Sequence, residues 1–190
     1  MDFTATRRQA IVGATTLLAT GASSGRAFAE KPANIGYDDS NITWATLDWL
    51  ENVSYYVYDV DEQAGIVDVM FKFVPNKPVM LHTHHVPYIT HVVQGELRFY
   101  HPDGKPKETR YTGSYVNGHV TGIPHTEGGG PEGAIVFFSN RNVKDLCYEF
   151  WDKEGKSFKT FRLQDFRAAF DAQIASGVME KTMSKRAPKA

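Results

Sequence analysis

Short stretches with apolar residues at every second position, separated by turn-forming residues, run through most of this chain. Between Val67 and Phe73 the apolar residues recur with a period of two, as expected for a strand with one face in a core. Pro75–Pro78 and the loop 101–106 are typical turn segments. We expect strands over Ile42–Leu50, Val53–Val60, Val67–Phe73, Met80–His84, Ile89–Gln94, Glu96–Tyr100, Glu108–Tyr111, Ala134–Ser139, Cys147–Trp151 and Ser157–Phe161.

The period changes near the end of the chain. Leu163, Phe166, Phe170 and Ile174 recur at intervals of three and four residues, which predicts an amphipathic helix. Many short strands with Gly and Pro turns, followed by one helix, indicate an all-β sandwich or barrel. We expect a single domain over 30–180 and a polar tail over 181–190.

Composition and charge exclude several functional classes. Apolar residues make up 42% of the chain, which is enough for a core. A net charge of −1 gives no positive field for nucleic acid or an anionic membrane. Cys147 is the one cysteine, so an intramolecular disulfide and a multi-cysteine zinc or iron–sulfur site are excluded.

Residues 1–29 resemble an export signal of the twin-arginine (Tat) type. Arg7 and Arg8 precede a weakly apolar run, and the segment ends in Ala27-Phe28-Ala29, which is typical of a signal-peptidase site. The apolar run is too short for a membrane-spanning helix. We therefore expect a periplasmic protein without a membrane partner after cleavage; an ordinary secretory signal is the alternative.

All seven histidines lie between His82 and His125. His82-Thr83-His84 is the most informative part of this cluster, because residues two apart in a strand share a face, with Cα atoms roughly 7 Å apart. Both imidazoles can then bind one ion, while His85 faces the other side. A third ligand has to come from a distant segment, and His125 is the best candidate, because Gly122-Ile123-Pro124 fixes its direction.

These motifs resemble those of the cupin superfamily. His82, His84 and Gly95 match the first cupin motif, although Tyr88 stands at its acidic position. Gly113, Gly122 and His125 match the second motif. The resemblance implies a double-stranded β-helix, or jelly-roll barrel, whose metal-site core spans about 65–140 and holds one ion on His82, His84 and His125.

The chain also resembles a narrower group, the three-histidine cupins similar to acetylacetone and 2,4′-dihydroxyacetophenone dioxygenases. The shared pieces are Ile42-Thr43-Trp44, Gly113-Ser114-Tyr115-Val116, the Gly-x-Pro-His turn and Asp152–Lys156. This resemblance implies a non-heme Fe(II) dioxygenase that cleaves a C–C bond of a small diketone or hydroxyketone with O₂, and a homodimer as the common assembly. Zinc, manganese and nickel are alternative metals. Another metal-dependent cupin enzyme (an isomerase or lyase) and a non-catalytic metal- or ligand-binding sensor are the alternative functions.

Four further residues and one glycine-rich segment have plainer interpretations beside their functional ones. Tyr88 and His119 are candidates for the surroundings of the metal, although Tyr88 can simply pack. His91 follows Tyr88 by three residues, so on a regular strand the two side chains point to opposite faces, and an inward Tyr88 places His91 on the outside. Either residue is an additional candidate metal ligand. Glu127 has the parity of His125, but we expect an exposed loop acid there. Gly128–Pro131 is expected to be a flexible lip over the site or a plain loop.

Overall fold

The computed structural model describes residues 36–177, which form ten strands and one helix. The strands are β1 (Ala45–Leu47), β2 (Leu50–Asp61), β3 (Ile66–Phe73), β4 (His82–His84), β5 (Tyr88–Tyr100), β6 (Pro106–Tyr111), β7 (Tyr115–Gly118), β8 (Thr126–Asn140), β9 (Leu146–Trp151) and β10 (Ser157–Arg162), and α1 covers Leu163–Ala175. The all-β class with a C-terminal helix is confirmed. The predicted signal at 1–29 and the tail at 181–190 lie outside the described residues.

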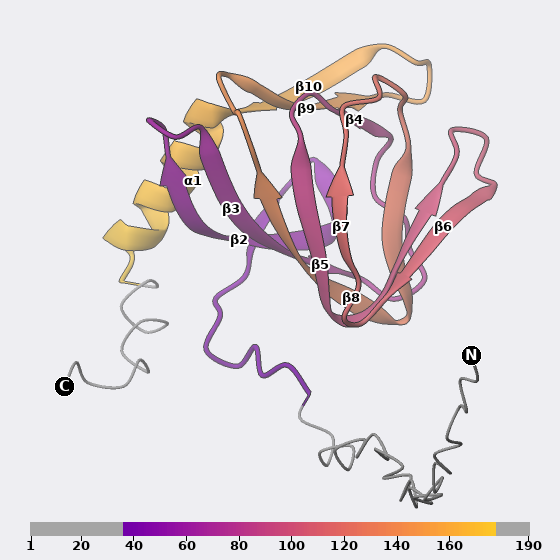
Figure 1. Ribbon diagram of the computed structural model, residues 1–190, viewed down its shortest axis with the longest axis horizontal. Coiled ribbons are helices and arrows are strands. Elements are labelled where there is room, and N and C mark those ends of the chain that lie inside the picture. Colours follow the sequence, from indigo (N-terminus) through magenta and orange to yellow (C-terminus); the bar gives the residue numbers. More distant parts are fainter. Residues whose placement is uncertain (1–35, 178–190) are drawn as a thin grey trace, which may run out of the picture. The chain divides into compact units, whose positions relative to one another are not determined.

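The strands form two antiparallel sheets, which Figure 1 shows facing each other. The larger sheet has the order β1-β2-β3-β8-β5-β6, with β7 also paired to β5, and the smaller sheet has the order β10-β9-β4. Side chains of both sheets, among them Val57, Phe138, Tyr148 and Phe150, build one buried core. The strand alternation in the sequence produces this core because every second side chain points between the sheets.

Helix α1 closes one end of the core beside β2 (Figure 1). Phe166 is buried against Phe161 and Tyr148, with ring centroids 4.5 and 6.0 Å away. The Gln173 amide accepts a hydrogen bond from the Val57 backbone N–H and donates one to the Val57 carbonyl. The helix therefore satisfies backbone groups of β2 as a neighbouring strand would. Within residues 36–177, no helix is long and apolar enough to cross a membrane.

Some predicted boundaries are wrong. Ile42–Trp44 precede the short β1 instead of forming its start, β7 was not predicted, and β5 continues through Gly95. The largest error concerns β8, which begins at Thr126 and not at Ala134. Gly128, Gly129 and Gly130 are buried inside this strand, so the predicted lip or loop is wrong.

The glycines of β8 and β5 allow backbones to approach closely. A Cβ on Gly128 would lie 2.4 Å from the Lys77 carbonyl oxygen, and one on Gly95 would lie 2.1 Å from the Gly133 carbonyl oxygen. Gly95 also has φ +76°, and the β5–β8 register shifts on both sides of it. This bulge lets the first part of β8 turn away and bring residues 125–127 towards β4.

Substitution of Gly95 tests the importance of this contact. We expect Gly95→Ala to lower the free energy of unfolding by about 3 kcal/mol, because left-handed strain and the clash with Gly133 add. Gly104 has a similar φ of +81°, but a Cβ added there would meet nothing within 4 Å, so Gly104→Ala should cost only the strain, about 1–2 kcal/mol. Urea denaturation measures both values, and equal losses would contradict the role of the clash.

Candidate metal centre

Strand β4 directs the two histidines of the H-x-H motif into the core. Thr83, between them, points the other way, where its hydroxyl accepts a hydrogen bond from the Trp151 indole N–H at 3.0 Å. His82 and His84 are both buried and lie opposite Phe150 and Tyr148 of β9. The prediction that both imidazoles point to the same side of the strand is therefore confirmed.

The backbone brings His125 to the same place. His82 and His125 exchange two backbone hydrogen bonds, of 2.9 and 3.0 Å, in an isolated antiparallel bridge. The centroid of the His125 ring lies 4.7 Å from that of His82 and 5.2 Å from that of His84, whose own rings are 5.1 Å apart. The three predicted ligands thus converge, although they come from segments about forty residues apart.

A carboxylate joins the three imidazoles. Glu127 follows His125 by two residues, shares its side of the chain and is buried, with Oε1 3.8 Å from Nε2 of His82. Ligand atoms of His82, His84, His125 and Glu127 all lie within 4.8 Å of one another. The expectation of an exposed loop acid is wrong because β8 extends to Thr126; the parity with His125 was the signal that could have identified this residue.

The polar atoms of this cluster fit a metal ion. Nδ1 of His82 lies 3.0 Å from the Met80 carbonyl and donates to it, so the lone pair of Nε2 points into the cluster. Nδ1 of His84, Nε2 of His125 and Oε2 of Glu127 are buried without a hydrogen-bond partner. Such unpaired buried atoms are costly, and a divalent cation would satisfy imidazole and carboxylate donors together.

Burial sets the protonation of the cluster. It lowers the pKa of His82 to about 3 and that of His125 to about 4, and holds the pKa of His84 well below its usual value. It also raises the pKa of the Glu127 carboxyl to about 8. The three imidazoles are therefore neutral at pH 7, which is the form that binds metal ions.

Of the other candidate residues, Tyr88 contacts this cluster and His119 lines the pocket that reaches it. The Tyr88 ring packs on that of His84 at 4.1 Å, and burial raises the pKa of its hydroxyl to about 12, which disfavours a phenolate ligand. His119 is exposed and lines the pocket that reaches His84 and His125. His91 lies near the Tyr115 ring, and His85 contacts Glu149 at 3.0 Å; neither is in the cluster of possible ligands among the described residues.

Comparison with solved structures identifies the fold. An RmlC-like cupin from Ralstonia eutropha aligns with a TM-score of 0.57 and 15% identity, over 80% of this chain and 90% of its own. The chain has the cupin fold. An acetylacetone dioxygenase from Acinetobacter johnsonii aligns with a TM-score of 0.55 and 14% identity, over 90% and 99% of the two chains. A putative one from Methylibium petroleiphilum gives 0.54 and 13%, over 74% and 96%.

Sequence comparisons add nothing to this structural likeness. No family model matches the chain. No curated protein matches it either. The jelly-roll prediction is confirmed by the structural likeness, which at these identities concerns the fold.

The protonation of the cluster predicts how stability of the metal-free protein depends on pH. Because the histidine pKa values are lower in the folded protein, the unfolded chain binds more protons at acid pH, and stability is lost as pH falls from about 6.5 towards 4. Because the Glu127 pKa is higher in the folded protein, stability is lost as pH rises from about 4.5 to 8. Each group contributes a slope of at most about 1.4 kcal/mol per pH unit. Three histidines outweigh one carboxyl below pH 6.5, so stability should be greatest near pH 6.5.

Chemical denaturation of the metal-free protein between pH 4 and 8 measures this profile. Glu127→Gln should abolish the loss above pH 6.5 and leave the loss at acid pH. His101→Gln, in an exposed loop, is the control and should retain both. A profile that Glu127→Gln leaves unchanged would show that this carboxyl does not titrate as its burial implies.

Removal of one imidazole should empty the site. Loss of a neighbour that only orients a ligand weakens metal binding by ~10–100-fold, so His125→Ala, which removes a ligand, should weaken it by at least about 100-fold. Elemental analysis after dialysis measures the metal content. His91→Ala is the control, because this histidine lies outside the cluster, and it should keep the wild-type content. An unchanged content in His125→Ala would refute the assignment.

Proposed function

We propose that this protein is a metal-dependent enzyme that uses O₂ to cleave a C–C bond of a small diketone or hydroxyketone, with Fe(II) on His82, His84 and His125. The observation that supports it best is the buried cluster of three neutral imidazoles and one carboxylate. The fold likeness to acetylacetone dioxygenases agrees with this proposal.

Three neutral ligands leave the charge of a divalent ion uncompensated. When bound there, Fe(II) would supply a Lewis acid for the two oxygens of a dicarbonyl compound and a redox-active centre for O₂, while the bonds of the substrate supply the electrons that reduce O₂. A β-diketone binds best as its enolate anion, which requires loss of a proton. We assign the acceptance of that proton to Oε2 of Glu127, because this atom is buried, unpartnered and beside the histidines. Burial alone raises the pKa of this carboxyl to about 8, and a cation on the histidines would favour its ionised form, which can accept the proton.

The walls of the site suit a small, partly apolar substrate. The Phe150 ring lies 5.5 Å from that of His82, and Phe138 lies 6.2 Å from His84. An apolar cavity lined by Val53, Phe71, Phe138 and Phe150 reaches His82 and Glu127. These side chains would hold the carbon skeleton and exclude water from the reacting atoms.

Oxygen consumption decides between the proposed reaction and its alternatives. We expect anaerobic addition of acetylacetone to the Fe(II) protein to produce a charge-transfer absorption band, and admission of air to consume one O₂ per molecule of substrate. Turnover without O₂ uptake would favour an isomerase or lyase, and binding without turnover would favour a sensor.

The Glu127→Gln variant tests the role of this carboxyl as the proton acceptor. It should keep the iron, because the three imidazoles remain, and it should slow substrate loss at least about 100-fold, since general base catalysis contributes about 10²–10⁴-fold. The control variant His101→Gln should match the wild type in both measurements.

A further inference from the structure

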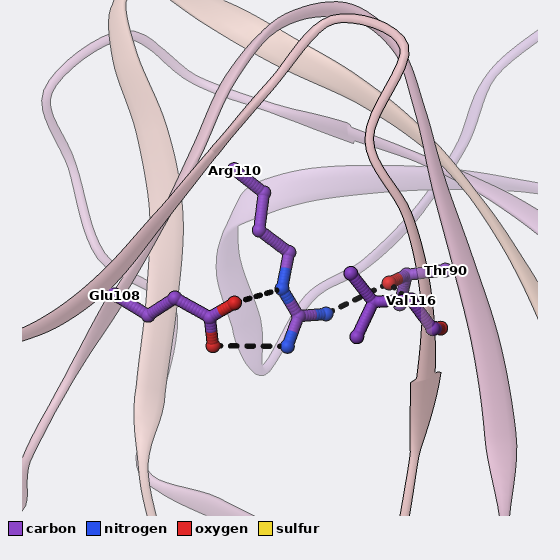
Figure 2. Close-up of polar contacts among 4 residues, drawn as sticks. All are labelled: Thr90, Glu108, Arg110 and Val116. Atoms are coloured by element: carbon purple, nitrogen blue, oxygen red, sulfur yellow. Dashed lines mark hydrogen bonds and ion pairs between the residues drawn. The ribbon is translucent and has the colours of Figure 1, made fainter.

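A buried arginine lies in the pocket beside the cluster of possible metal ligands. Arg110 of β6 has only 9% of its side chain exposed. Figure 2 shows how it is held: Nε and one terminal nitrogen donate to the two oxygens of Glu108 at 2.7 and 3.0 Å, and the other terminal nitrogen donates to the Thr90 hydroxyl at 2.7 Å. The guanidinium is therefore fixed in one orientation before any ligand arrives.

The position of Arg110 connects it to the histidines. Its guanidinium carbon lies 4.3 Å from the centre of the Phe99 ring, and this ring lies 5.8 Å from that of His125. Arg110, His84, Tyr88 and His125 line one pocket. The positive charge of Arg110 contributes to the lowered pKa values of His84 and His125. A small molecule on the histidines would thus have this cation as a neighbour.

The charges that line this pocket are mainly positive. Two cationic side chains, Lys107 and Arg110, and one carboxylate, Glu108, line the pocket. The Glu108 side chain is 42% exposed. Glu127, which clusters with the three histidines, does not line this pocket. A guanidinium has five N–H groups, and three of those on Arg110 have a protein partner among the described residues. Two donors stay available for a ligand.

The fold has no evident need for a charge here. Taking a guanidinium out of water is expensive, and replacing a buried ion pair with apolar residues of similar size is often neutral or stabilising. Arg98 and Glu96 of β5 form the same two-residue ion pair away from this pocket, where it stays one-third exposed. Glu108 is 42% exposed, so the burial concerns the Arg110 guanidinium, and this burial is better explained by ligand binding than by folding.

We propose that Arg110, assisted by Lys107, binds a carboxylate of the substrate, so that the preferred substrate is a small β-oxo acid and not a neutral diketone. The carbonyl end would face the three histidines, and the carboxylate end would accept hydrogen bonds from the guanidinium. This inference rests on the proposed function and replaces the neutral diketone with an anionic 1,3-dicarbonyl compound.

Two probes of nearly equal size test this inference: acetoacetate carries a carboxylate where acetylacetone carries an acetyl group. Calorimetry on the anaerobic Fe(II) protein gives Kd for each, and their ratio is the preference for the carboxylate. We expect Arg110→Met to reduce this preference by about tenfold, as loss of a charged hydrogen bond would. Arg98→Met is the matched control and should leave the preference within twofold of the wild type.

A second variant separates ligand binding from a structural role. Glu108→Gln removes the competing carboxylate, so it should increase the preference for acetoacetate by about threefold, whereas a purely structural ion pair predicts no increase. Its partly exposed position keeps it informative even where Arg110→Met fails to fold. An unchanged preference in Glu108→Gln and in any folded Arg110→Met, or iron-loaded protein that binds neither probe, would overturn the inference. Wild-type protein that retains no iron would instead contradict the proposed function.

Discussion

The two backbone hydrogen bonds between His82 and His125 are the contact on which the rest of the site depends. They join a three-residue strand of the small sheet to the residue just before β8 of the large sheet. Because antiparallel bridging fixes both position and direction, the side chains of His82 and His125 must lie together. His84 and Glu127 then follow by parity alone, each two residues away on the same side of its segment. One bridge therefore sets the place of four polar groups.

This arrangement is costly for the fold without a ligand. Three imidazoles and a carboxyl occupy a core built mainly from aliphatic and aromatic side chains, and three of their polar atoms lack a hydrogen-bond partner. The burial that keeps the histidines neutral also raises the pKa of Glu127, so the cluster holds little net charge at pH 7. A bound cation would relieve both costs, because it pairs with the lone pairs and favours the ionised carboxylate. Metal binding at this cluster would therefore stabilise the barrel.

The sequence predicted the parts of the molecule that local patterns determine. Alternation predicted most strands, the change of period predicted α1, and the spacing of His82 and His84 predicted their common direction. Glu127 and the start of β8 were missed for one reason: Gly128–Gly130 resembles a loop by composition. Glycine is needed at 128 and 129 of this strand because the backbones of residues 74, 77 and 133 come too close for any Cβ, and a Cβ on Gly130 would meet the Glu96 side chain. Such a requirement arises from tertiary contacts, which the local pattern does not contain.

Arg110 is a second residue whose position the local sequence pattern could not predict. A Lys-Glu-Thr-Arg sequence on a predicted strand looks like a solvated face, and Lys107 to Thr109 are indeed exposed. Arg110 differs because β6 pairs with the end of β5 beyond the bulge at Gly95, so its side chain passes over Phe99 towards His125. The cluster of possible metal ligands therefore has the aromatic rings of β9 on one side and the guanidinium of Arg110 on β6 near another. A ligand with a short carbon skeleton and two different ends would be oriented by this asymmetry alone, before any ligand bond forms.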